Sequence, residues 1–203
     1  MGTMDNPVND SKGCGGMMRA APIGLFLHAD PAYAFRIAAE GAAITHGHPT
    51  GYLAAGVFAA IIALLICNVR LSVACDEAAA MLRRYEGYEE VLHAMDNARE
   101  MSESSLQTIR AIRKLGGGWV AEEALAIGLC CALRAVSFQQ ALAASVNHDG
   151  DSDTTGTVCG HILGAGSKFS VPAEWTQKLE LGPYIARRGR ELCQLRERAR
   201  ARA

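Results

Sequence analysis

The chain has 203 residues and a formal net charge of −1, and 50% of its residues are hydrophobic although only 6% are aromatic. This length suits one domain with a substantial core, and the near-neutral charge gives no chain-wide attraction to nucleic acid. Alanine is abundant, and few segments are rich in Val, Ile, Thr or aromatic residues. The composition therefore predicts closely packed helices and not a sheet.

The cysteines and the N-terminus bear on the compartment. Seven cysteines are scattered along the chain without a CxxC pair. Free thiols in a reducing cytoplasm are the simplest interpretation, and neither a zinc site nor a disulfide framework is expected. The first residues show neither the basic start nor the apolar segment of a signal peptide. We therefore expect a cytoplasmic protein.

A glycine-rich loop is the first feature along the chain. Residues 1–10 are expected to form a disordered lead, and residues 11–186 a single helical domain. The loop reads Ser11, Lys12, Gly13, Cys14, Gly15, Gly16. Such loops let backbone N–H groups approach a phosphate closely. The lysine precedes the glycines and the GxGxxG spacing is absent, so no Walker loop or dinucleotide fingerprint is predicted. Taken alone, the loop is best interpreted as a tight turn between helices.

Helical periodicity dominates the middle of the chain. A helix is predicted over residues 31–44, with Asp30 as its N-cap and a proline in its first turn. Residues 49–69 contain no charged residue, and we predict a helix buried on all sides in a bundle in preference to a membrane span. Further helices are expected over residues 76–97 with a break at Gly87, and over 104–115, 121–135 and 137–144.

A histidine pair lies between the first two predicted helices. His46 and His48 flank a glycine and precede a proline. Zinc needs three or four ligands, and no other donor cluster is close by in the sequence. The residues therefore favour a histidine that hydrogen-bonds to a ligand or to the backbone.

Three carboxylates then follow at alternate positions: Asp149, Asp151 and Asp153, with Thr154 next. Acids this close repel one another, and a hard cation such as Ca²⁺, Mg²⁺ or Mn²⁺ relieves the repulsion. An EF-hand is excluded, because its position twelve would be Gly160 instead of a glutamate. A helix N-cap explains one or two of the acids but does not require three. We favour a metal site.

The last part of the chain combines a glycine stripe with a basic end. Gly156, Gly160 and Gly164 recur every four residues, which predicts a helix that a neighbour can approach closely. Residues 187–203 carry seven arginines and two glutamates and are expected to form a basic C-terminal helix or tail. A solvated amphipathic helix is preferred to a nucleic-acid contact.

Several separated segments agree with one family, and the chain resembles the ADP-ribosylglycohydrolases, the family of the dinitrogenase reductase-activating glycohydrolase. The resemblance rests on residues 11–22, 45–49, 122–125 and 147–154, and on the pattern of Val171-Pro172, Trp175 and Leu179-Glu180. The Gly-Asp-x-Asp-Thr block at residues 150–154 is the most specific of these.

The resemblance implies an all-α fold with a binuclear Mg²⁺ or Mn²⁺ centre. It also implies hydrolysis of the glycosidic bond that joins ADP-ribose to a protein side chain or to a small conjugate. On the matching motifs, Asp151, Asp153 and Thr154 are similar to metal ligands, and His46 to a ligand-contacting histidine. The loop at Ser11, Lys12, Gly13, Cys14, Gly15 and Gly16 is similar to the family's pyrophosphate-contacting loop.

One departure from the family bears on activity. The family pattern begins with a further stretch that carries a Gly-Asp-Ala-x-Gly-like block, a Thr-Asp-Asp ligand block and the expected catalytic acid, and these blocks are not found in this sequence. The chain is thus similar to the C-terminal two thirds of a family member. A catalytically incomplete fragment, or an ADP-ribose-binding remnant with one of the two ligand sets, stays open as an alternative.

Two further expectations follow from the sequence. Without the preceding helices, residues 49–69 are expected to expose apolar surface and to favour self-association through it. A phosphate- or nucleic-acid-binding helical module is a third interpretation, based on the loop and the arginine-rich end, and it has the least support.

Overall fold

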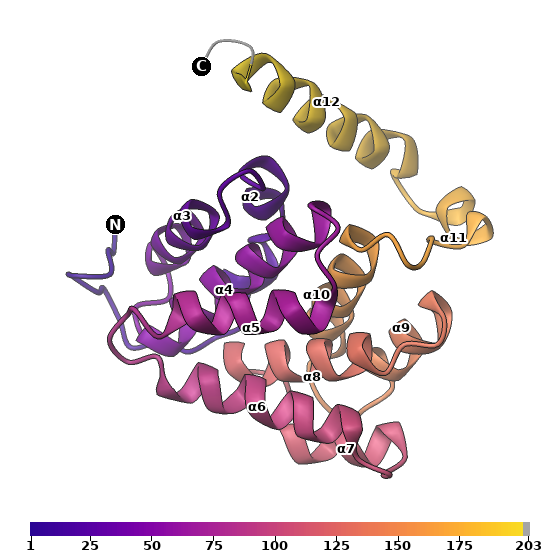
Figure 1. Ribbon diagram of the computed structural model, residues 1–203, viewed down its shortest axis with the longest axis horizontal. Coiled ribbons are helices and arrows are strands. Elements are labelled where there is room, and N and C mark those ends of the chain that lie inside the picture. Colours follow the sequence, from indigo (N-terminus) through magenta and orange to yellow (C-terminus); the bar gives the residue numbers. More distant parts are fainter. Residues whose placement is uncertain (201–203) are drawn as a thin grey trace.

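The computed structural model describes residues 1–200, and within them the protein is all-α, as predicted (Figure 1). Strand pairing in this part of the chain is limited to an isolated antiparallel bridge between Gly13 and Val120. The helices in chain order are α1 Gly15–Met18, α2 Ala21–Phe26, α3 Pro31–Ala43, α4 Pro49–Ile66, α5 Leu71–Leu82, α6 Glu89–Glu103, α7 Thr108–Leu115, α8 Ala121–Leu133, α9 Phe138–Val146, α10 Ser152–Ala165, α11 Ala173–Lys178 and α12 Gly182–Arg200.

Helix α4 is the centre of the fold. It contacts α1, α2, α3, α5, α6, α8 and α10, and residues such as Leu53, Phe58 and Ile61 are fully buried. Each such side chain contributes roughly 1.5–3 kcal/mol through its removal from water. Among the described residues α4 has the length and hydropathy of a membrane span, with a mean hydropathy of 2.0, and 89% of it is buried inside the fold. The prediction of a helix buried on all sides is confirmed.

The expectation that residues 49–69 expose apolar surface is therefore wrong. Almost all of α4 is buried, and its neighbours come from both earlier and later parts of the chain. Self-association through this segment loses its physical basis, because the apolar face that would drive it is already covered.

Most predicted helix ends agree with the structure. The Asp30 carboxylate accepts the backbone N–H of Tyr33 at 3.0 Å, and the Ser137 hydroxyl accepts that of Gln140 at 3.1 Å. The break predicted at Gly87 separates α5 from α6, and this glycine has a φ of +72°.

Three local predictions differ from the structure. The helical region predicted over residues 76–97 is longer, because α5 already begins at Leu71 and α6 continues to Glu103. Helix α7 begins at Thr108 and not at residue 104. The Arg134 guanidinium donates hydrogen bonds to the carbonyls of Ser104 and Leu106 at 3.0 and 2.6 Å, so these carbonyls are not used in a helix. The glycine-rich loop continues into a short helix, α1, which its glycines did not suggest.

Helices α8, α9 and α10 pack closely, and glycines make this approach possible. A Cβ on Gly128 of α8 would lie 2.4 Å from the Val158 side chain on α10. A Cβ on Gly156 of α10 would lie 2.6 Å from Val146 on α9, whereas one on Gly164 would meet nothing within 4 Å. The predicted stripe therefore serves close packing at its first glycine and not at its last.

The two ends of the chain lie outside this core. Residues 1–10, expected as a disordered lead, contain no helix, and the Asn9 amide donates to the Thr45 carbonyl at 3.0 Å. Helix α12 stands apart from the body and contacts only α11 and α2 appreciably (Figure 1). Residues 201–203 of the predicted basic end lie outside the described residues.

Candidate functional site

Backbone hydrogen bonds join three distant segments into one site. The Cys14 N–H donates to the Trp119 carbonyl at 3.3 Å, and the Ala121 N–H donates to the Lys12 carbonyl at 2.8 Å. The Asp151 N–H in turn donates to the Gly117 carbonyl at 2.8 Å. The glycine-rich loop, the segment before α8 and the start of α10 are therefore held together without reliance on side chains.

The carboxylate of Asp151 is the point where the loop meets α10. Asp151 is the N-cap of α10, and its Oδ1 accepts the Thr154 N–H at 3.3 Å. Its Oδ2 accepts the Cys14 thiol at 2.9 Å, while the Thr154 hydroxyl lies 3.4 Å from the same sulfur. Asp151 and Thr154 are only 7% and 2% exposed. The structure thus brings together one loop residue and two of the predicted metal ligands.

The ionisation states of this contact are consistent with a thiol that donates to a carboxylate. Burial raises the pKa of the Cys14 thiol, and the hydrogen bond to Asp151 raises it further. Burial opposes ionisation of Asp151, but hydrogen bonds from the Cys14 thiol and from Thr154 favour the carboxylate, and the pKa of Asp151 lies below its usual value. The helix N-terminus also favours the negative charge.

The three alternate acids do not converge on one point. Asp153 is exposed on the first turn of α10, and Asp149 forms an exposed ion pair with Arg113 at 3.0 Å. In residues 1–200 there is no cluster of three or more His, Cys, Asp or Glu side chains that could hold a metal ion. The donors at Asp151, Asp153 and Thr154 fit Mg²⁺ or Mn²⁺ in type, because all are oxygens, but they are fewer than a six-coordinate cation needs.

A second network fixes the turn before α10. The Gly150 N–H donates to Nδ1 of His148 at 3.1 Å, so Nε2 carries the proton and donates to the Thr155 hydroxyl at 2.9 Å. That hydroxyl donates to the Ser145 carbonyl at 2.6 Å. This neutral histidine holds the end of α9 against the start of α10, a role that the sequence did not indicate.

His46 lies directly against the glycine-rich loop. A Cβ on Gly13 or Gly16 would come within 3.3 or 3.1 Å of its ring. The Arg19 guanidinium donates to the Thr45 hydroxyl at 2.7 Å, and that hydroxyl lies 2.8 Å from Nδ1 of His46. Burial lowers the pKa of His46, and the positive charge of Arg19 lowers it further. The ring is therefore neutral, with Nε2 beside the loop.

The side chain of Lys12 anchors the glycine-rich loop to α6. Its ammonium donates to Glu90 on α6, which also accepts the Thr50 hydroxyl at 2.8 Å. The hydrogen bond to Glu90 raises the pKa of Lys12. Glu122 lies 3.9 Å from the same ammonium, and its Oε2 is buried without a hydrogen-bond partner among the described residues. Burial raises the pKa of Glu122.

The neighbouring Glu123 shapes the segment that touches Asp151. Its Oε2 accepts the N–H groups of Gly117 and Gly118 at 2.9 and 3.0 Å, and Gly118 has a φ of +80° that favours glycine. Trp119, which follows, is 66% exposed beside the loop. From the sequence, Glu123 was assigned only to the first turn of a helix. Its side chain also anchors the preceding segment, and no sequence pattern predicted this contact.

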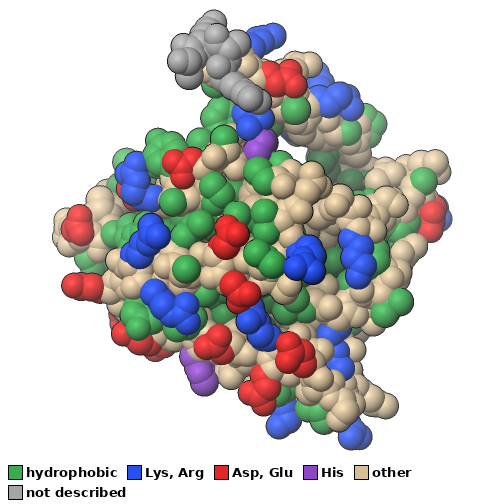
Figure 2. All heavy atoms as spheres, in the orientation of Figure 1, with side chains coloured by type: hydrophobic (Ala, Val, Ile, Leu, Met, Phe, Trp, Pro, Cys, Tyr) green, Lys and Arg blue, Asp and Glu red, His purple; other side chains and the backbone are tan. Residues whose placement is uncertain are grey.

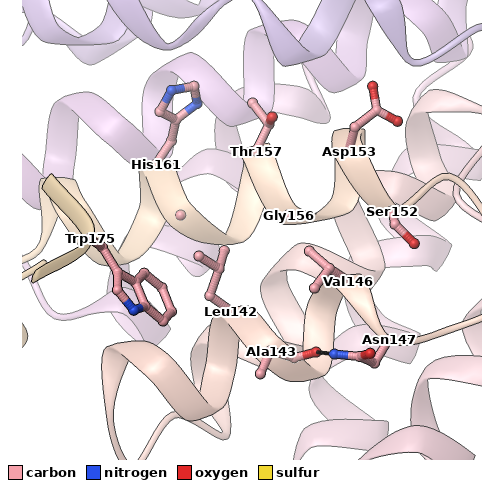
Figure 3. A pocket seen from close by; sticks show the side chains of 11 residues that line it. Leu142, Ala143, Val146, Asn147, Ser152, Asp153, Gly156, Thr157, His161 and Trp175 are labelled. Carbon is pink, nitrogen blue, oxygen red and sulfur yellow. Dashed lines mark hydrogen bonds between the residues drawn. The ribbon is translucent and has the colours of Figure 1, made fainter. Parts of the chain in front are cut away.

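An open groove of about 580 Å³ begins at Asp153 and runs along α9 and α10 (Figure 3). Asp153, Thr157 and His161 form a row along one side of α10 at four-residue spacing. Trp175 of α11 lies at the far end, where it packs edge-on against Phe138 with ring centroids 6.2 Å apart. Asp153, the exposed candidate for a metal ligand, therefore lies at the edge of a largely apolar groove.

Comparison with known proteins agrees with this all-α fold. The family model described as ADP-ribosylglycohydrolase matches residues 2–202, which is nearly the whole chain. The chain belongs to the ADP-ribosylglycohydrolase family. An uncharacterised protein of Archaeoglobus fulgidus is 30% identical to it over 187 residues, which are 91% of this chain and 59% of that protein. The chain thus spans about 59% of the length of this relative.

Proposed function

We propose that the chain acts in a metal-dependent hydrolase that cleaves the glycosidic bond of ADP-ribosylated proteins or related ADP-ribose conjugates. One observation carries this proposal. The glycine-rich loop and the Gly-Asp-x-Asp-Thr block, 137 residues apart in the sequence, meet where the Cys14 thiol donates to Asp151 at 2.9 Å. The segments to which the proposal gives the pyrophosphate and the metal are therefore in contact.

The loop is suited to a pyrophosphate. The N–H groups of Gly15 and Gly16 begin α1 and donate to no acceptor in the described part of the chain. The neutral His46 ring lies against the same glycines, and its Nε2 likewise has no partner there. The two backbone N–H groups offer hydrogen-bond donors at short range. Lys12 is engaged with Glu90, so its role is to fix the loop.

Asp151, Asp153 and Thr154 would hold Mg²⁺ or Mn²⁺. The chemistry supplied by a bound cation would be the orientation of ribose hydroxyls and of an attacking water. The chain itself contributes the orientation of these ligands: Asp151 is fixed by the helix cap and by Cys14, and Thr154 is buried beside it. Asp153 lies at one end of the groove, where an acceptor side chain would lie.

A second candidate is an ADP-ribose-binding protein without hydrolytic activity. The specific observation in its favour is that the acids of the described chain do not form a three-ligand metal cluster. The two candidates share the loop and differ only in the metal site.

Calorimetric titration with ADP-ribose and with Mn²⁺, together with hydrolysis of ADP-ribosyl-arginine and ADP-ribosyl-serine, tests both. Turnover that Asp151→Asn and Asp153→Asn abolish, and that Asp149→Asn leaves intact, supports the hydrolase. Asp149 is the matched control because it pairs with Arg113 away from the site. Binding of ADP-ribose without turnover supports the second candidate, and no binding of either ligand refutes both.

A further inference from the structure

Helix α12 is an isolated amphipathic helix. Its apolar side chains Ile185 and Leu195 are 51% and 55% exposed. Arg187, Arg190 and Arg198 lie on one neighbouring side, because their spacings are close to whole helical turns. Only Arg187 of these three forms an ion pair in the described residues, with Glu191 of the same helix at 3.2 Å.

The charge of the chain is divided between this helix and the body. Residues 187–203 carry seven arginines and two glutamates, a net charge of +5. This leaves a net charge of −6 on residues 1–186, although the whole chain is at −1. A near-neutral total therefore conceals two oppositely charged parts, and opposite charges on separate surfaces steer association.

The acidic counterpart lies on α6. Glu89, Asp96, Glu100 and Glu103 recur at spacings of seven, four and three residues, which places them in one line along the helix. All four are exposed, and none forms an ion pair within residues 1–200. We call this line the acidic stripe of α6. Several acidic side chains are visible in the lower centre of Figure 2, over the region where Figure 1 draws α6.

The helix and the stripe cannot meet within one chain. Figure 1 shows α12 at one end of the molecule and α6 at the opposite end, with the body between them. Helix α12 contacts α11 and α2 and not α6. The arginines of α12 can therefore reach an acidic stripe of this kind only on another molecule.

We propose that α12 of one copy binds the acidic stripe on α6 of a second copy. Arg187, Arg190 and Arg198 face Glu89, Asp96, Glu100 and Glu103. Leu195, which lies one turn before Arg198, gains cover in this contact. The contact is head-to-tail, because each copy offers its helix at one end and its stripe at the other. Such contacts continue into an open chain of molecules unless the rotation closes a ring.

Sedimentation velocity of the full chain tests this in 50 mM and in 500 mM NaCl. The wild type is expected to associate with rising concentration in low salt, and to associate roughly tenfold more weakly in high salt, where screening is strong. Arg190→Gln/Arg198→Gln and Asp96→Asn/Glu100→Gln/Glu103→Gln are each expected to reduce association roughly tenfold. Circular dichroism checks that both variants keep their helix content.

A mixture of the two variants gives the decisive result. Each variant keeps the surface that the other has lost, so an equimolar mixture is expected to form a 1:1 dimer and to stop there. Arg83→Gln/Arg84→Gln is the matched control, since these exposed arginines lie on neither surface. A wild type that stays monomeric in 50 mM NaCl, association that ignores salt, or a mixture that stays monomeric overturns the proposal. Arginine variants that lose only the binding of an oligonucleotide, with self-association unchanged, overturn it as well.

Discussion

The Asp151 carboxylate has two roles that a pair of substitutions separates. In Asp151→Ala the cap of α10 is lost, because no oxygen accepts the Thr154 N–H, and the Cys14 thiol loses its acceptor. The cap contributes about 1 kcal/mol, and the unpaired thiol adds about 1 kcal/mol. A loss of about 2 kcal/mol corresponds to a fall in Tm of about 4–8 °C in a chain of this size.

Asp151→Asn is expected to behave differently. Asparagine caps helices about as well as aspartate, so the expected loss is below about 0.5 kcal/mol. The amide is nevertheless a poorer ligand for a hard cation than a carboxylate. Both variants should therefore lose the stabilisation by Mn²⁺, which adds about 2.7 kcal/mol to the free energy of unfolding of the wild type at a hundredfold excess over Kd and raises its Tm.

Thermal unfolding by circular dichroism, with and without Mn²⁺, measures both effects. Asp153→Asn is the control, because that carboxylate is exposed and caps nothing: it should lose the response to Mn²⁺ and keep the wild-type Tm without metal. If Asn at position 151 destabilises the fold as much as Ala, the capping argument is refuted. If it keeps the full response to Mn²⁺, the assignment of Asp151 as a ligand is refuted.

Three other predictions concern packing and pH. Gly128→Ala should lower the free energy of unfolding in urea by about 1–3 kcal/mol, because its Cβ would overlap Val158. Gly164→Ala should raise it by up to about 1 kcal/mol, because its Cβ meets no neighbour. Equal effects of the two substitutions would contradict the packing. Glu122→Gln should have a higher Tm than the wild type at pH 8, and this difference should disappear towards pH 4. Burial raises the pKa of Glu122, so its ionised form destabilises the folded wild type at high pH. A difference in Tm that does not change with pH would contradict this prediction. The pKa of His46 is lowered, so the free energy of unfolding of the wild type should decrease as the pH drops below about 6.5. His46→Gln should lack the part of this decrease that comes from protonation of the ring. Identical pH profiles of the two proteins would show that the pKa of His46 is not lowered by the fold.

Local chemistry was enough to predict those helices whose ends carry their own signals. Asp30 and Ser137 cap α3 and α9 as their residue types indicate, because a cap bonds to a backbone N–H three residues away. Helix α4 was predictable from its uniform apolar composition. The start of α7 was not, because Arg134, which follows α8, determines the conformation of residues 104–107.

The same distinction applies to the site. Residue types drew attention to the three alternate acids, and only the resemblance to the family indicated a binding role for the loop and narrowed the ligands to Asp151, Asp153 and Thr154. The partners of these residues were not predictable: Lys12 pairs with Glu90, 78 residues away, and Cys14 reaches Asp151. Such pairings depend on how helices are placed in space, and a single sequence without a structure contains no periodic signal for them.

The burial of α4 also has a consequence for the chain before it is complete. During synthesis, α4 emerges before α8 and α10, two of the helices that cover it. Until residue 165 is available, an 18-residue segment with a mean hydropathy of 2.0 lacks part of its cover. Exposed apolar surface of this kind makes folding intermediates prone to aggregation and a target for chaperones. We therefore expect ribosome-bound chains that end before α10 to bind a holdase chaperone, and chains extended past it to be released.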